Sequence, residues 1–348
     1  MTEAGSHPWL SGLFDDAETA RLWSPEAQLA HMRAFEAAWS RAGPIAGLWS
    51  RDEGAAAAEA IERAEVDLQA LRDGTARDGV CVPELVRQFK AAAGASVHRG
   101  ATSQDVIDTA TILCLVATLD LFEQRLNDLI LSLSALEDRF GAVSIMGRTR
   151  MQAALPMLAR TRLQSWSVPL DRHRTRLAAL RPQISVVQIG GAVGDRASLG
   201  ANAAEFSEAV ATSLGLSAPP QAWHSARDGI SEAASLLSLI SGSLGKMGQD
   251  IALMAQQGVE EILLSGGGGS SAMPHKQNPV LAELLVTLAR YNATLVAGMH
   301  QSLVHEQERS GAAWALEWLI LPQMAQTTGC ALGAARQVLA RITRIGPA

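Results

Sequence analysis

Apolar residues recur along most of the chain at the three- and four-residue spacing of amphipathic helices. Runs that alternate apolar and polar residues, as half-buried strands do, are few. Alanine, leucine, glutamate, glutamine and arginine, which favour helices, fill the same stretches. The pattern therefore predicts an all-α fold.

Glycine and proline divide this pattern into segments. Ser24 before Pro25 predicts an N-cap followed by proline at the first helical position, and this helix should end before Gly43. Farther along, the breakers leave several helical segments that are longer than the usual globular helix. These segments cover roughly 103–139, 157–180, 228–264 and 279–306.

Helices of this length are typical of an elongated bundle, and they carry more apolar residues than a narrow seam would bury. We therefore expect the extra apolar faces to pack against other copies of the chain. The most apolar window, 109–122, contains Asp120 and is too short to cross a bilayer, so no membrane segment is predicted. The expected division is an N-terminal helical domain over 1–100 and a bundle over 101–348.

Composition and charge narrow the function classes. The chain has 348 residues, is 48% hydrophobic and carries a formal net charge of -6. Such a chain lacks the basic surface that nucleic acid or an anionic membrane would require. Its three cysteines, Cys81, Cys114 and Cys330, are spaced too widely for a disulfide framework or a zinc site. Because residues 1–23 also lack a signal-peptide pattern, we expect a cytoplasmic protein.

Three segments interrupt the helices with small, polar and ionisable residues. The first, 98–105, precedes a long helix, so its hydroxyls and free backbone N–H groups are suited to an anion. Ordinary capping explains the same residues without a ligand, with Ser103 as the N-cap of a helix that starts at Gln104. Both interpretations stay open from the residues alone.

The second segment, 190–195, is a glycine-rich turn that invites a dinucleotide-binding interpretation. Its spacing differs from the G-x-G-x-x-G fingerprint, and strand-like residues before it cover only 184–189. Because glycine permits close approach of the backbone, a turn that passes near another part of the protein is the better prediction.

The third segment, 266–279, combines four glycines with two serines, a histidine, a lysine and two prolines. Its order does not match a phosphate-binding P-loop. A flexible linker does not normally continue into Met, Pro, His, Lys and Asn. The alternative is a lid over an active site, in which glycines provide hinges and the later residues provide chemistry.

Residues 269–279, which read Gly-Ser-Ser-Ala-Met-Pro-His-Lys-Gln-Asn-Pro, resemble the G-S-S-x-M-P-x-K-x-N-P signature of the fumarase/aspartase superfamily. Residues 100–109 and 147–156 resemble the other two substrate-binding stretches of that superfamily, so the resemblance covers nearly the whole chain. It implies a central bundle of long helices, a homotetramer, and active sites that each combine three subunits. It also implies that the C-terminal domain of longer members is reduced or missing.

The resemblance assigns roles to single residues. Ser270 resembles the catalytic serine that exchanges a proton beside a carboxylate, and Lys276 and Asn278 resemble groups that stabilise the developing negative charge. Thr102 and Ser103 resemble carboxylate binders. The remaining expected site residues are Arg150, Gln152 and His98 as substrate-binding groups, and Glu283 and Ser271 as supporting groups. No metal or organic cofactor is implied.

One departure carries information about the reaction. Fumarases, argininosuccinate lyases and adenylosuccinate lyases read T-H-x-Q in the second stretch, whereas this chain reads T-R-M-Q over 149–152. Arg150 stays protonated and cannot shuttle a proton, so it is left to bind a carboxylate or to pair with Glu283. This suits a reaction whose leaving group needs no acid, as in the superfamily's cycloisomerases, which form a lactone from 3-carboxy-cis,cis-muconate.

Two further stretches, 223–228 and 306–318, resemble the cycloisomerases, although core packing explains their tryptophans equally well. The implied function is therefore that of a cycloisomerase, which acts on a small polycarboxylate through an aci-carboxylate intermediate. Adenylosuccinate lyase, or another C–N or C–O lyase of the superfamily, remains the alternative enzyme. A crystallin-like structural homologue remains the non-enzymatic alternative.

Overall fold

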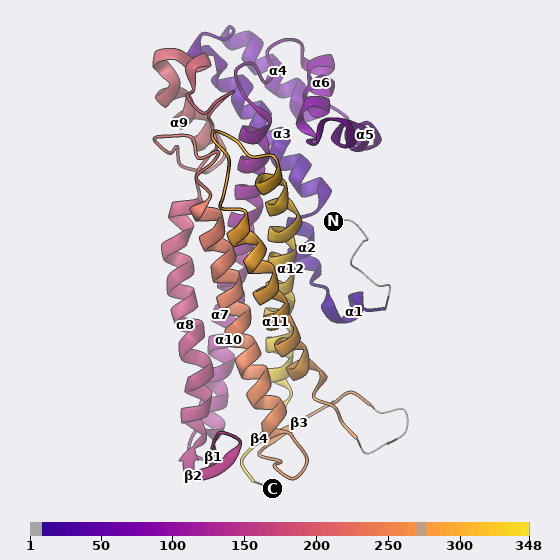
Figure 1. Ribbon diagram of the computed structural model, residues 1–348, viewed down its shortest axis with the longest axis vertical. Coiled ribbons are helices and arrows are strands. Elements are labelled where there is room, and N and C mark those ends of the chain that lie inside the picture. The colour runs from indigo at the N-terminus through magenta and orange to yellow at the C-terminus, as the bar shows by residue number, and fades with distance from the viewer. Residues whose placement is uncertain (1–8, 270–272, 274–275, 348) are drawn as a thin grey trace.

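The computed structural model describes residues 9–269, 273 and 276–347, so Ser270 and Ser271 lie outside the described residues. Helices dominate the chain, which confirms the all-α prediction. Five long helices run along one another as an elongated bundle (Figure 1). They are α7 (Ser103–Phe140), α8 (Ala159–Ile184), α10 (Asp228–Met254), α11 (Val280–Gln301) and α12 (Ala312–Ala340).

Two of the helix predictions need correction. The predicted segment 228–264 is too long, because α10 ends at Met254 and the chain then turns into strand β3 (Ile262–Leu264). The four predicted segments also omit α12, although it lies in the bundle and packs against α10 and α11. Pro322 lies inside α12 without ending the helix.

The bundle is held together by a continuous apolar core. Along α7, buried side chains such as Leu115, Leu119, Phe122 and Leu126 are fully covered at helical spacing. Burying one such side chain contributes roughly 1.5–3 kcal/mol. Close contact between α10 and α11 depends on glycine, since a Cβ at Gly245 would lie 2.4 Å from the Cβ of Ala289.

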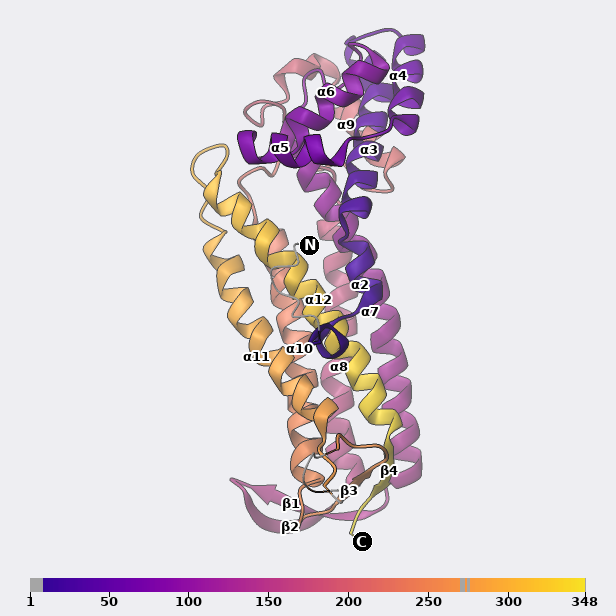
Figure 2. The same cartoon turned by 90° about the vertical axis from the view of Figure 1, so that its right-hand side faces the viewer.

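Shorter helices cover one end of the bundle (Figures 1 and 2). The Oγ of Ser24 accepts a hydrogen bond from the N–H of Ala27, and the helix that follows ends at Ala42, which confirms the predicted capping and boundary. The division at residue 100 stays a prediction. The helices toward this end are α3 (Pro25–Ala42), α4 (Arg51–Arg63), α5 (Leu68–Asp78), α6 (Val82–Ala93) and α9 (Ala203–Ser213), whereas α1 (Ser11–Phe14) and α2 (Ala17–Leu22) lie along the side of the bundle (Figure 1).

Two small antiparallel sheets lie at the opposite end (Figure 1). The first is a hairpin of β1 (Ser144–Thr149) and β2 (Gln152–Leu158), and the second pairs β3 with β4 (Ile342–Ile345). Arg150 and Met151 form the hairpin turn with φ values of 49° and 66°. Asparagine and glycine usually occupy such left-handed positions, so an arginine followed by a methionine does not predict this turn.

Candidate active site

The first polar segment lies at the start of α7. Thr102 precedes the helix as its N-cap, so the predicted cap at Ser103 and helix start at Gln104 are each one residue late. The difference arises because the carboxylate of Asp105, not a serine hydroxyl, accepts the Thr102 N–H at 3.0 Å. Within the described residues the Ser103 hydroxyl has no hydrogen-bond partner, so it is available to a ligand.

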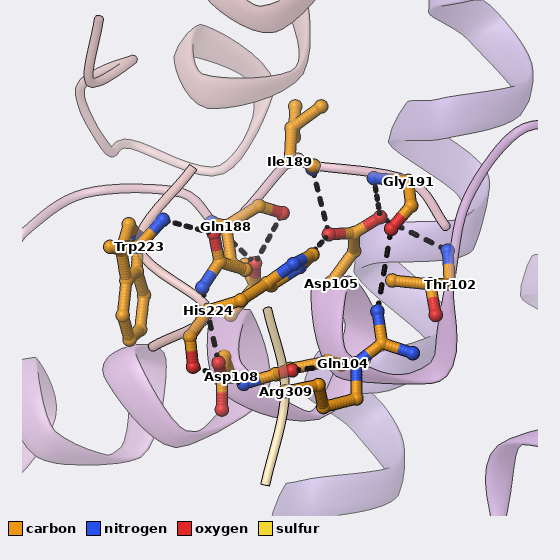
Figure 3. Close-up of polar contacts among 12 residues, drawn as sticks. Thr102, Gln104, Asp105, Asp108, Gln188, Ile189, Gly191, Trp223, His224 and Arg309 are labelled. Carbon is orange, nitrogen blue, oxygen red and sulfur yellow. Dashed lines mark hydrogen bonds and ion pairs between the residues drawn. The ribbon is translucent and has the colours of Figure 1, made fainter. Parts of the chain in front are cut away.

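Asp105 joins this segment to the glycine-rich turn (Figure 3). Its buried carboxylate accepts the backbone N–H groups of Gly190 at 2.8 Å and Gly191 at 3.0 Å. The imidazole Nε2 of His224 lies 2.8 Å from the same carboxylate. A Cβ at Gly190 would lie 2.5 Å from the His224 ring, so only glycine fits. These contacts confirm that the turn passes close to another part of the protein.

One helical turn deeper, a second buried carboxylate meets a buried guanidinium. Arg227 donates to Asp108 at 2.7 and 3.1 Å and to Glu317 at 2.9 Å. Burial alone would lower the pKa of Arg227, but the two carboxylates outweigh it and raise that pKa. Burial raises the pKa of Glu317 despite the guanidinium. The indole N–H of Trp314 also donates to Asp108 at 2.8 Å, so the cluster is closely hydrogen-bonded.

His98 lies just before this segment in a left-handed conformation, with a φ of 60°. Its Nδ1 is 2.6 Å from the carboxylate Oε1 of Glu36, a residue of α3 that is fully buried. Burial lowers the pKa of His98, but the charge and hydrogen bond of Glu36 outweigh burial and raise it above its ordinary value. The predicted substrate-binding histidine is therefore held by a carboxylate at the same end of the bundle as Thr102.

The stretch 147–156 and the described residues of 266–279 lie at the other end of the bundle (Figure 1). Arg150 and Gln152 are exposed at the tip of the β1–β2 hairpin. Lys276 is exposed, while the backbone of Asn278 pairs with Gly268 through hydrogen bonds of 3.0 and 2.9 Å. Glu283 is exposed in the first turn of α11.

One chain does not bring these segments together. The 38 residues of α7 separate them by roughly 57 Å at about 1.5 Å per residue. Thr102 and Ser103 therefore lie far from Lys276 and Asn278 of the same chain. No ion pair joins Arg150 to Glu283 within the described part of the chain, so their expected pairing stays a prediction.

A family model described as lyase matches residues 14–292. The chain belongs to the fumarase/aspartase superfamily of lyases. A 3-carboxy-cis,cis-muconate cycloisomerase from Pseudomonas aeruginosa is 37% identical over 335 residues, which cover 93% of this chain and 73% of the relative. An N-acetyl-S-(2-succino)cysteine lyase from Enterococcus italicus is 33% identical over 317 residues, which cover 89% of this chain and 70% of the relative.

A solved structure agrees with this assignment. The 3-carboxy-cis,cis-muconate lactonizing enzyme from Pseudomonas putida matches with a TM-score of 0.90 at 35% identity, covering 97% of this chain and 77% of that structure. The match extends over nearly the whole chain, so this lyase shares its elongated bundle with that member of the superfamily.

The candidate site includes residues to which the sequence patterns assigned no role. Asp105, Asp108 and Glu317 were not singled out, and His224 and Arg227 served only to identify cycloisomerases. A signal was nevertheless present. Asp105 and Asp108 are three residues apart on one predicted helix, and His224 and Arg227 are also three residues apart. In the structure, Asp105 pairs with His224 and Asp108 pairs with Arg227.

A cavity of about 170 Å³ lies beside this cluster, between α3, α7 and α12. Apolar side chains dominate its wall, including Trp23, Met32 and Leu321. Asp108 and Glu317 also line it, whereas no lysine, arginine or histidine does. Since a carboxylate would meet negative charge and apolar surface there, this lining disfavours an anionic ligand.

Proposed function

We propose that this lyase is a cycloisomerase that converts 3-carboxy-cis,cis-muconate to 4-carboxymuconolactone in the catabolism of protocatechuate. Relatives named as cycloisomerases, at 35–38% identity over at least 90% of the chain, support the proposal. The structural observation that carries it is Arg150 at the exposed hairpin tip. A permanent cation there suits a substrate rich in carboxylates and cannot act as a proton-donating acid.

In the proposed reaction, one substrate carboxylate oxygen adds to the conjugated double bond and closes the lactone ring. Electron density moves to the carbon beside another carboxylate, which becomes a dianionic aci-acid. Lys276 and Asn278 stabilise that charge, and Ser270 delivers a proton to the carbon. Solvent then returns a proton to Ser270, so the reaction consumes one proton overall. No acid is required for a leaving group in this scheme.

The complete active site is proposed to combine subunits of a homotetramer. Two observations support this assembly. The expected site segments lie at opposite ends of α7 in each chain. In addition, α11 is long and apolar enough to resemble a membrane span, yet only 28% of its most apolar stretch is buried within the chain. We infer that neighbouring subunits cover this surface, and that the enzyme works in the cytoplasm, where its three free cysteines stay reduced.

The direct test is the loss of ultraviolet absorbance when purified protein is mixed with 3-carboxy-cis,cis-muconate. Ser270→Ala should reduce the rate by orders of magnitude while the oligomer stays intact. Ser132→Ala, which changes a partly buried serine on α7 that bonds only within its own helix, is the matched control and should leave the rate unchanged.

Two other functions give different results in the same experiment. Serine-dependent cleavage of adenylosuccinate or of N-acetyl-S-(2-succino)cysteine, without reaction of the muconate, would place the chain among the other lyases of the superfamily. A crystallin-like structural homologue would turn over none of these compounds, and Ser270→Ala would then change nothing.

A further inference from the structure

Glu36 is an unusual residue for the interior of α3. It lies between the buried residues Phe35 and Ala37, and its side chain is fully shielded from solvent. A carboxylate in such a place is costly unless a cation or several hydrogen bonds compensate it. Its Oε1 meets the Nδ1 of His98 at 2.6 Å, whereas its Oε2 has no hydrogen-bond partner among the described residues.

The loop that carries His98 is also fixed to α3 by neutral hydrogen bonds. The hydroxyl of Ser40 donates to the carbonyl of Ser96 at 2.9 Å, and the indole of Trp39 donates to the carbonyl of Arg99 at 3.1 Å. Attachment of the loop therefore does not require a buried charge, because a glutamine at position 36 would complete the same set of hydrogen bonds. The carboxylate must serve another purpose.

The free side of the imidazole indicates that purpose. Within the described residues, Nε2 of His98 makes no hydrogen bond, and it is not among the nitrogen atoms closed off from solvent. The left-handed backbone at φ 60° is a strained conformation for histidine, and the surrounding contacts hold it there. The ring is thus fixed with Nδ1 toward a carboxylate and Nε2 available to a ligand.

We propose that Glu36 is a positioning residue that keeps His98 as an imidazolium, so that its Nε2–H presents a fixed positive charge to a carboxylate of the substrate. This proposal rests on the polycarboxylate substrate proposed above. Three charged groups act on His98 from the elements around it: Glu36 from α3, Asp105 from α7 and Lys90 from α6. The two carboxylates favour the imidazolium and the lysine opposes it, and only Glu36 contacts the ring.

The test compares Glu36→Gln, which keeps the shape and the hydrogen-bond acceptor but removes the charge, with Glu36→Asp, which keeps the charge. The first measurement is an NMR titration of the His98 ring in the complete protein without substrate. The ring signal of His98 is identified by its absence from the spectrum of His98→Asn. Asparagine tolerates the left-handed backbone, so this variant preserves the loop. We expect Glu36→Gln to lower the pKa of His98, because the charge of Glu36 is removed, and Glu36→Asp to restore part of it.

The second measurement is the binding of propane-1,2,3-tricarboxylate, followed as a function of pH, together with KM and kcat for the muconate. Loss of the imidazolium at neutral pH should weaken tricarboxylate binding and raise KM about tenfold, with kcat nearly unchanged. The affinity of Glu36→Gln for the tricarboxylate should approach that of the wild type when the pH is lowered enough to protonate His98. The melting temperature of each variant separates this effect from unfolding.

The outcomes are distinct for the two proposals. An unchanged His98 titration in Glu36→Gln, or a lowered pKa without any effect on tricarboxylate binding at neutral pH, would overturn the role of Glu36. Failure of every preparation to react with the muconate, while the titration and tricarboxylate binding change as expected, would overturn the cycloisomerase function and leave the positioning role standing.

Discussion

Arg227 offers the most demanding test of the buried charge cluster. In Arg227→Met an unbranched apolar side chain replaces the guanidinium, and every hydrogen bond from that group to Asp108 and Glu317 is lost. Those two carboxylates are only 1% and 4% exposed, and water in the adjoining cavity cannot supply the lost positive charge. Removing one partner of a buried ion pair costs about 3–5 kcal/mol, and we expect a loss of that size.

The assay is the free energy of unfolding from denaturant titration, at one protein concentration because the proposed subunit association would also add stability. The loss should depend on pH. Burial already raises the pKa of Glu317, and without Arg227 that pKa rises further in the folded state, so the folded variant binds more protons than the unfolded chain above pH 4.5. Stability of the variant should therefore fall as pH rises and recover on acidification.

The matched control is Arg63→Met, which removes an exposed ion pair with Glu59 and should have little effect. A loss below about 1 kcal/mol in Arg227→Met, or a loss that is the same at pH 5.5 and pH 8, would refute the reasoning. Either result would mean that water or a rearranged side chain compensates the two carboxylates.

Two further predictions concern the glycine turn and the N-terminal helices. In Gly190→Ala the new methyl group would lie 2.5 Å from the His224 ring, so we expect the free energy of unfolding to fall by about 1–3 kcal/mol and the melting temperature to decrease. The control is Gly12→Ala, where no atom lies within 4 Å of the new methyl group, and it should be neutral. Burial raises the pKa of Asp16, but Arg125 and Thr19 outweigh it and lower that pKa below 3.8. The Asp16 carboxylate therefore contributes fully to stability above pH 3.8, and this contribution is lost as the pH falls through its lowered pKa. Asp16→Asn should reduce the urea midpoint at pH 6, and the midpoint of this variant should decline less steeply toward pH 2.

The helices were predictable where the signal is local. Ser24 and Pro25 mark a helix start through the hydrogen bonds and backbone angles of adjacent residues, and the structure agrees. The β1–β2 hairpin was not, because Arg150 and Met151 occupy left-handed positions that neither residue favours. Contacts elsewhere in the hairpin must hold that turn, and sequence patterns do not report them.

The polar cluster illustrates the limit for long-range contacts. Asp105 pairs with His224 and Asp108 pairs with Arg227, and each pair is separated by 119 residues. Each partner alone is compatible with a solvated helix face, which is why the sequence left these residues without a role. The equal spacing of three residues in both stretches becomes meaningful only when a bundle places α7 beside the start of α10.

The length of α7 also limits how the candidate site can form. The loop that carries Lys276 and Asn278 spans roughly 15 residues between β3 and α11, and its two ends are anchored near each other at one end of the bundle. Even fully extended, such a loop reaches about 25 Å from its anchors, less than half of the roughly 57 Å to Thr102 of the same chain. Motion of the loop therefore cannot complete the site within one subunit. If these residues act on one substrate, a neighbouring bundle must run in the opposite direction, with its loop beside the first chain's Ser103.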